Sequence, residues 1–332
     1  MRPLYGSKSN VRGLCSCMVH RCIWKMATRK DNKRRWLFGG AVTLLLGAWF
    51  LWSGMRDGYL PEEAELTVVH LTDLHLDTRG KVMHTPWTHK IAAGRYRLHR
   101  PCTGRAFEYL EQAVSQMKDT IKPDVVVITG DVVNHADDNE ALRRGVSILS
   151  RLQCPVVVAQ GDHDVSRRMQ NKTDWNDLFG ATHGCTVVNN TRFVFLPFAK
   201  DEAAFADVLQ SVRTVSGRDK IHFLCLHRML WAPSLMEVLA KRYHGCSVLD
   251  PEREKIVEAM EASDGRWMVL CGHSHTDHCR TRGNITQLCA PSLAEYPHIF
   301  RVIKIKNGQV FCQRVRLDRG DTTCQAPPRI KP

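Results

Sequence analysis

The stretch Leu66–His75, with the sequence LTVVHLTDLH, contains the residues that decide the fold. Its apolar run, rich in Val and Leu, is typical of a buried strand. The stretch ends in Asp73 and His75, a carboxylate and an imidazole of the kinds that bind metal ions. Because residues two apart on a strand point the same way, we expect both side chains to leave its carboxyl end on one side, where they can bind one cation. Alone the pattern is weak, since Asp-x-His occurs by chance in many chains and is more often a solvated turn.

Similar apolar runs recur along the chain, and each ends in Asp or His, several of them after a Gly that lets the backbone turn closely. The runs are DVVVIT before Gly130-Asp131, VVVA before Gly161-Asp162-His163-Asp164, HFLCL before His227, and WMVLC before Gly272-His273-Ser274-His275. Between the Leu66 stretch and DVVVIT, a period-3.6 pattern predicts a helix over 103–121, with Thr103 as a cap and Pro123 after the end. Between DVVVIT and VVVA, a second such pattern predicts a helix over 139–152. This βαβαβ order with continuous apolar strands predicts a parallel or mixed sheet with ligands at the carboxyl ends.

Further elements are predicted from the middle and the end of the chain. They are a helix at 175–179, a hairpin about Asn189-Asn190, a helix carrying Phe205, Val208, Leu209 and Val212, a helix over 251–262 capped by Asp250, and a final hairpin of 299–306 and 309–317 about Asn307-Gly308.

Five strand ends therefore deliver a set of oxygen and imidazole ligands: Asp73, His75, Asp131, Asp162, His163, His227, His273 and His275. Five such ends in succession speak against a chance arrangement of structural His and Asp. Ligands of this kind without Cys suit Mn, Fe or Zn, and their number suits two ions that share one bridging carboxylate. Two such ions can lower the pKa of a bridging water and hold the oxygens of an in-line phosphoryl displacement.

The order D-x-H, G-D, G-N-H-D/E, H and G-H-x-H, matched over roughly residues 66–280, resembles that of the calcineurin-like metallophosphoesterases. The resemblance implies an α/β fold, a four-layer αββα sandwich, and a metal-dependent phosphoric ester hydrolase that uses two divalent or trivalent metal ions. It also implies the role of each residue. The first ion is held by Asp73, His75, Asp131 and His275, and Asp131 bridges to a second ion held by Asp162, His227 and His273. His163 contacts the phosphate or protonates the leaving oxygen, and Asp164 orients the His163 ring.

Two positions depart from the family's pattern. The family's G-D-x-x-D ends here in Asn134, which removes a nearby carboxylate but no direct ligand. Where the family has Asn, this chain has Asp162, which can still bind a cation but adds a negative charge and loses an amide donor. We expect tighter metal binding and weaker anion binding, and hence an altered substrate choice or reduced activity.

The net charge of +13 belongs mostly to the first 35 residues, which hold ten Lys or Arg and one acid. The other 297 residues carry 37 basic and 33 acidic residues, so the body makes no strong case for binding nucleic acid. A nuclease, another branch of the same superfamily, is disfavoured for this reason.

Residues 36–55, WLFGGAVTLLLGAWFLWSGM, contain no formal charge and are long enough to cross a membrane as a helix. The basic cluster before them predicts a cytosolic tail over 1–35 and an uncleaved signal anchor, that is, a single-pass type II protein with its catalytic domain in the lumen or outside the cell. Cleavage of a signal peptide and secretion is the alternative. A polar linker over 56–65, a metallophosphoesterase domain over 66–317 and a tail over 318–332 follow.

Sequons and cysteines fit delivery across a membrane. Sequons begin at Asn171, Asn189 and Asn284, which predicts a glycoprotein. Ten cysteines follow residue 55, an even number compatible with oxidation. Cys225 and Cys271 lie in apolar runs that favour buried thiols, whereas Cys271, Cys279 and Cys289, or Cys312 and Cys324, are disulfide candidates whose connectivity the sequence does not give.

The sequence thus predicts a membrane-anchored phosphoesterase that hydrolyses a phosphomonoester or phosphodiester, with a phosphorylated small molecule or lipid as its substrate. The alternative is a weakened or inactive relative that binds metal or a phosphorylated ligand, and Asp162 is the feature that supports it.

Overall fold

The structure of the protein, a computed structural model, describes residues 60–79, 105–165, 173–198, 201–215, 217, 220–231, 251–295 and 297–317. All of them belong to one compact unit, Gly54–Pro332. The predicted cytosolic tail, the predicted membrane span over 36–55 and the C-terminal tail lie outside the described residues, as does the start of the linker. Among the described residues, no helix is both long and apolar enough to span a membrane.

The described residues form two sheets, of which the first has five strands in the order β11-β10-β1-β2-β3. Strands β1, β2 and β3 are parallel, as the βαβαβ pattern predicts, and the closing hairpin adds β10 antiparallel to β1. The bounds of the strands are β1 (Leu66–Leu71), β2 (Val125–Thr129), β3 (Val156–Ala159), β10 (Ile299–Lys306) and β11 (Gln309–Arg316).

The second sheet has six strands within the described residues, in the order β4-β5-β6-β7-β9-β8, and its central strands β5, β6, β7 and β9 are parallel. The bounds are β4 (Gly184–Val188), β5 (Thr191–Phe195), β6 (Ile221–Cys225), β7 (Arg266–Cys271), β8 (His278–Arg282) and β9 (Ile285–Cys289). The β8–β9 hairpin was not predicted from the sequence. Strand β8 is a polar edge strand without an apolar run, so its only local signal in the sequence is Gly283, which has a φ of 57° at the turn.

The helices are α4 (Ala106–Gln116), a π-helical turn η2 (Met117–Ile121), α5 (Asn139–Leu149), α6 (Thr173–Phe179), α7 (Glu202–Arg213) and α9 (Pro251–Ala262). The first predicted helix therefore widens in its last turn and ends at Ile121. Its C-cap Lys122, one residue before Pro123, has a φ of 50°. The N-cap is Arg105, and the predicted cap Thr103 lies outside the described residues, as does Asp250. The carboxylate of Asp138 caps α5 by accepting from the backbone N–H of Ala141.

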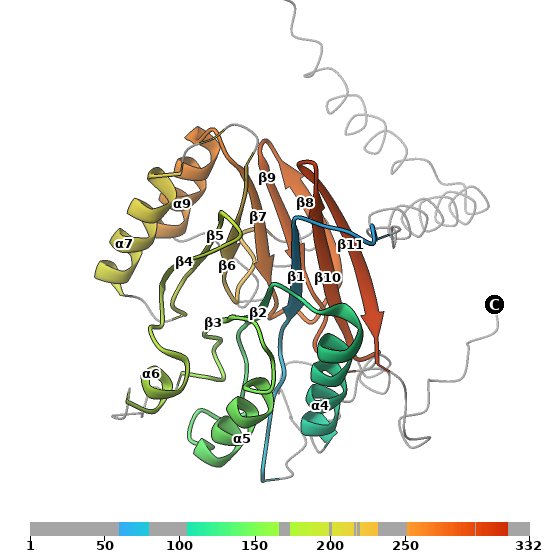
Figure 1. The fold of residues 1–332 in the computed structure, drawn as a ribbon. Coiled ribbons are helices and arrows are strands. Elements are labelled where there is room, and N and C mark those ends of the chain that lie inside the picture. Colours follow the sequence, from blue (N-terminus) through green and yellow to red (C-terminus); the bar gives the residue numbers. More distant parts are fainter. Residues whose placement is uncertain are drawn as a thin grey trace, which may run out of the picture. The chain divides into compact units, whose positions relative to one another are not determined.

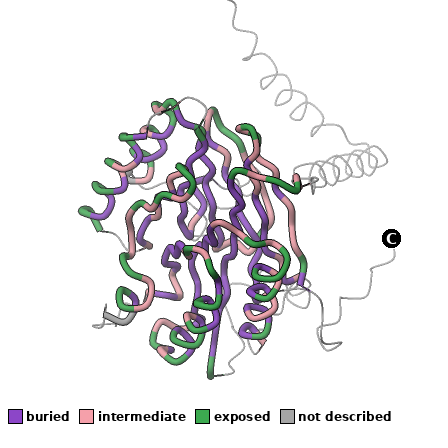
Figure 2. The backbone as a smooth tube through the Cα atoms, viewed as in Figure 1, coloured by how far each residue is buried: buried purple, intermediate pink, exposed green. Residues whose placement is uncertain are grey.

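Three apolar layers give the domain its helix–sheet–sheet–helix order (Figures 1 and 2). Helices α4 and α5 pack on one face of the first sheet, and α7 and α9 pack on one face of the second. The inner faces of the two sheets meet in the third layer, where Phe193 of β5 stacks on Phe223 of β6 with 4.7 Å between ring centroids. The mixed α/β sheets agree with the predicted fold class.

Cysteines in these sheets are thiols in the structure. Cys271 and Cys289 are neighbours across β7 and β9, but each sulfur contacts a backbone carbonyl, that of Leu288 at 3.5 Å and that of Gly272 at 3.3 Å. Cys279 is also a free thiol. The predicted disulfides among these three residues are therefore absent from the described part of the chain.

Candidate metal centre

The predicted ligands lie on loops that directly follow the strands, and the backbone of five of them is left-handed. Strand β1 ends at Leu71, so Asp73 and His75 lie on a loop and not in extended strand, but their side chains still reach one ligand group, as predicted. Their φ angles are 51° and 45°, and Asp131, His273 and His275 have φ angles of 52°, 65° and 53°. Few residues other than Gly adopt this conformation, although Asp and His are enriched in it, and such strained residues cluster at functional sites.

Backbone hydrogen bonds and glycines let these loops approach each other. The N–H of Asp73 donates to the carbonyl of Gly130 at 3.0 Å, and the N–H of His75 donates to that of Asp131 at 2.9 Å. Gly130 has a φ of 90°, and a side chain there would collide with the His227 ring at 2.6 Å. A side chain at Gly272 would collide with Thr72 and with the carboxylate of Asp73. The glycines before the ligands are therefore required by the close approach of the loops.

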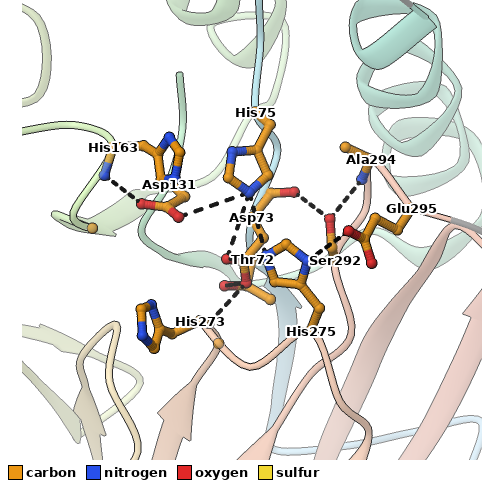
Figure 3. Close-up of polar contacts among 12 residues, drawn as sticks. Thr72, Asp73, His75, Asp131, His163, His273, His275, Ser292, Ala294 and Glu295 are labelled. Carbon is orange, nitrogen blue, oxygen red and sulfur yellow. Dashed lines mark hydrogen bonds and ion pairs between the residues drawn. The ribbon is translucent and has the colours of Figure 1, made fainter. Parts of the chain in front are cut away.

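One group of ligand atoms comes from Asp73, His75 and His275 (Figure 3). Nε2 of His275 lies 3.1 Å from Oδ1 of Asp73 and 3.4 Å from Nε2 of His75. Asp73 and His75 are fully buried, and Oδ1 of Asp73 accepts no hydrogen bond from any residue that the structure describes. These are the three residues that were predicted to hold the first ion together with Asp131.

A second group comes from Asp162, His227 and His273, which were predicted to hold the second ion. Oδ1 of Asp162 lies 3.0 Å from Nε2 of His227 and 3.0 Å from Nδ1 of His273, and the two nitrogens are 3.1 Å apart. Nδ1 of His227 lies 2.8 Å from the carbonyl of Thr129, to which it donates, so Nε2 presents its lone pair to the group.

Asp131 lies between the two groups. Its Oδ2 is 3.7 Å from Nε2 of His75 and 3.3 Å from Nε2 of His227, so one carboxylate oxygen faces ligands of both groups. Its Oδ1 accepts from the backbone N–H of His163 at 2.9 Å, which fixes the orientation of the carboxylate. This is the position that a bridging ligand requires.

The donor set fits two cations. Ligand atoms bound to one ion at about 2.1 Å lie about 3.0–3.4 Å apart, and the spacings within both groups fall in this range except for that between His75 and Asp73, which is 3.9 Å. Burial alone would raise the pKa of Asp162, but His227 and His273 outweigh it and hold this pKa well below its ordinary value. Burial likewise opposes protonation of His275, but Glu295 and Asp73 raise the pKa of His275 well above its ordinary value. Each group thus concentrates negative charge that a cation would neutralise.

The surroundings of His163 differ from the prediction. Its Nδ1 lies 2.8 Å from the backbone carbonyl of Asn134, so this carbonyl orients the ring. The carboxylate of Asp164 instead accepts from the backbone N–H groups of Gly161 at 2.8 Å and Val133 at 3.1 Å. The prediction that Asp164 orients the His163 ring is therefore wrong. Burial, together with the charge of Asp131, raises the pKa of Asp164 to about 7, and its role is to hold the loops after β2 and β3 together.

An acidic residue from another loop lies beside Asn134, the position at which the family pattern has a carboxylate. The Asn134 side chain is buried, and its Nδ2 donates to Oδ2 of Asp77 at 2.8 Å. Asp77 follows His75 by two residues, so the loop after β1 supplies an acid beside the position where the family pattern has one.

Sequence reasoning missed three residues that support the first group, Thr72, Ser292 and Glu295 (Figure 3). The hydroxyl of Thr72 donates to Oδ2 of Asp73 at 2.7 Å, and that of Ser292 donates to the Asp73 carbonyl at 2.8 Å. Oε1 of Glu295 lies 2.9 Å from Nδ1 of His275. Ser292 and Glu295 lie beyond the last motif, in a segment without an apolar pattern, and no local signal in the sequence identifies them.

The fold and the paired ligand groups define the class of protein, a two-sheet α/β domain with a candidate dimetal centre. The sequence model of the calcineurin-like phosphoesterases matches residues 66–304, and the chain belongs to this family.

Two solved structures share the fold. A dimetal phosphatase from Danio rerio is 13% identical, with a TM-score of 0.58, and the match covers 76% of this chain and 96% of that chain. The purple acid phosphatase PPD1 from yellow lupin (Lupinus luteus) seeds is 12% identical, with a TM-score of 0.53, over 77% of this chain and 52% of that chain. No match was found among curated proteins.

Proposed function

We propose that the protein is a membrane-anchored phosphoesterase that hydrolyses a phosphomonoester or a phosphodiester by a two-metal mechanism. The observation that carries the proposal is the position of Asp131, whose Oδ2 faces ligand atoms of both groups. Family membership and the fold shared with a dimetal phosphatase support a metal-dependent hydrolase. Two bound ions would activate a water and neutralise the phosphate oxygens.

The chain's own residues supply position and a proton. Asp73, His75 and His275 would hold one ion, and Asp162, His227 and His273 would hold the other, with Asp131 shared between them. Because the carbonyl of Asn134 accepts the Nδ1–H of His163, Nε2 of that ring is the atom that can hold a proton for the leaving oxygen. His163 also lies edge-on to His75, with 4.8 Å between ring centroids, which places it beside the first group.

The charge of Asp162 bears on the alternative, a weakened or inactive relative that binds metal or a phosphorylated ligand. With Asp73, Asp131 and Asp162 ionised, the ligand set carries three negative charges, which favours the ions over the substrate's phosphate. Asp162→Asn should therefore raise phosphoesterase activity, and activity that is unchanged or lower would contradict this account of Asp162.

The test of the function is turnover of an aryl phosphate by the full-length chain with Mn, Fe or Zn added. Asp131→Ala should abolish turnover, because it removes the oxygen shared by both groups. The matched control is Asp177→Ala, which removes an exposed acid on α6 and should leave turnover intact. If the wild-type chain binds two metals but turns over no phosphoester, the inactive alternative holds.

The membrane location supports a phosphorylated lipid or small molecule as the substrate. This part of the proposal rests on the apolar residues 36–55 and on the basic cluster before them, with secretion after signal cleavage as the alternative. Nucleic acid is not proposed as a partner, because the body of the chain is nearly neutral. Labelling of the catalytic domain in intact and in permeabilised cells tests the topology, and labelling only after permeabilisation of internal membranes would indicate a luminal domain.

A further inference from the structure

Arg228 is a cation beside the metal centre that lacks an acidic partner in the described part of the chain. It directly follows His227 at the carboxyl end of β6 and is partly buried. Its guanidinium carbon lies 4.6 Å from the centroid of the Phe198 ring, and its Nε is buried without a hydrogen-bond partner among the described residues. Buried parts of charged groups are normally paired. Because the guanidinium of Arg228 has no such partner among the described residues, it can bind an anionic ligand.

The position of Phe198 places this pair at the same edge of the sheet as the metal ligands. Phe198 follows β5, which is the neighbour of β6 on the side away from β7 (Figure 1). Its ring centroid lies 6.0 Å from that of His227. Since β5, β6 and β7 are parallel, Phe198 lies one strand beyond His227 on the side away from His273, and Arg228 of the loop after β6 lies against its ring.

Arg228 nevertheless lies outside the metal pocket. His227 contacts both Asp131 and Asp162, at 3.3 and 3.0 Å, whereas Arg228 forms no ion pair with either carboxylate. Its charge therefore does not replace a metal ion, and an anion bound to it would lie beside the reacting phosphate. A guanidinium offers paired donors that match the oxygens of a phosphate or a carboxylate, and stacking on an aromatic ring fixes its plane.

We propose that Arg228, whose guanidinium stacks on the Phe198 ring, forms a subsite for a second anionic group of the substrate. This inference rests on the proposed phosphoesterase function and narrows it. The substrate class is a phosphoester that carries another phosphate or a carboxylate close to the ester that is hydrolysed.

The test uses two probes that cannot be hydrolysed, methylphosphonate and methylenediphosphonate, which differ in one anionic group. Their dissociation constants for the metal-loaded full-length chain are measured by calorimetry at fixed metal concentration. In the wild type we expect the diphosphonate to bind more tightly, and Arg228→Ala should reduce its advantage over the monophosphonate roughly tenfold or more, as expected for a hydrogen bond to a charged group. Arg228→Lys keeps the charge without the paired donors and should give an intermediate ratio.

Arg144→Ala is the matched control. Arg144 also stacks on an aromatic ring, with its guanidinium carbon 4.0 Å from the centroid of Phe107, but it lies on the exposed side of α5. Chelation of metal by the diphosphonate acts equally in all variants, so the comparison isolates the guanidinium of Arg228. The proposal is overturned if Arg228→Ala leaves the ratio of the two constants unchanged, or if Arg144→Ala lowers it equally. Because binding is measured without turnover, this outcome is distinct from a chain that binds metal and fails to hydrolyse phosphoesters.

Discussion

The carboxylate of Glu295 orients the imidazole ring of His275. Oε1 of Glu295 accepts from Nδ1 of His275 at 2.9 Å, so Nε2, which lies 3.1 Å from Oδ1 of Asp73, is the nitrogen that would bind an ion. Carboxylates in this position orient a ligating imidazole and raise its basicity. The first group thus depends on a carboxylate that is not itself a ligand.

Removal of this carboxylate should weaken one metal position. Glu295→Ala should lower the affinity for one of two ions about 10–100-fold, whereas Glu295→Gln should cost less because the amide oxygen still accepts the Nδ1–H. Calorimetric titration with Zn or Mn resolves the two binding steps. Glu254→Ala, which removes an exposed acid on α9, should change neither step. Equal weakening of both steps by Glu295→Ala would show that Glu295 acts on the fold rather than on His275.

At the scale of elements, the side chain of Asn284 caps the end of helix α9. Asn284 lies in the turn of the β8–β9 hairpin, which was not predicted from the sequence. Nδ2 of Asn284 donates to the carbonyls of Met260 at 2.8 Å and Gly265 at 2.8 Å, with a longer contact to that of Ser263 at 3.3 Å. These carbonyls lie at the end of α9 and in the turn to β7, where the helix no longer supplies its own i+4 donors. The Met260 carbonyl also accepts from the backbone N–H and the hydroxyl of Ser263. The β8–β9 hairpin is therefore attached to the element that precedes His273.

Asn284→Asp should destabilise the domain by about 1–3 kcal/mol, because a carboxylate cannot donate to these carbonyls and brings its negative charge against their oxygens. Asn189→Asp is the matched control, since Asn189 lies exposed in the turn between β4 and β5 and makes one hydrogen bond of 3.2 Å to Glu65. Urea unfolding of both variants measures the difference. If both cost the same, the cap contributes nothing to the stability of the fold.

The same contacts bear on the predicted glycosylation. A glycan on Asn284 would replace a hydrogen of the Nδ2 that caps α9, so this sequon conflicts with the fold, whereas Asn189 is exposed. The sequon at Asn171 lies outside the described residues.

Across the whole molecule, the strands and the ligand types were predictable because both carry local signals. Apolar runs mark β1, β2, β3, β6 and β7, and the Asp and His residues follow them directly. Contacts between distant segments carry no such signal: Asn134 orients His163, and Glu295 reaches His275 only because the chain returns along β9 to the Asp73 loop. The left-handed backbone of Asp73 and His75 was also hidden, since their sequence reads as a continued strand.

The core between the two sheets makes the stability of the domain depend on pH through His70 of β1. This side chain is fully buried, with Nε2 2.9 Å from the hydroxyl of Thr129, and burial together with the charge of Arg301 lowers the pKa of His70 to about 3. A histidine with a depressed pKa stabilises the fold fully above the unfolded pKa of 6.5, and this contribution is lost as the pH falls from 6.5 towards 3. Between pH 7.5 and pH 5.0 the loss of folding free energy should be about 2 kcal/mol.

His70→Gln, which cannot be protonated, should lack this part of the pH dependence. Urea unfolding of both proteins at the two pH values, with a chelator present so that metal release does not contribute, measures the difference between them. Equal pH dependence in both proteins would show that His70 is already protonated in the folded state or is not buried there.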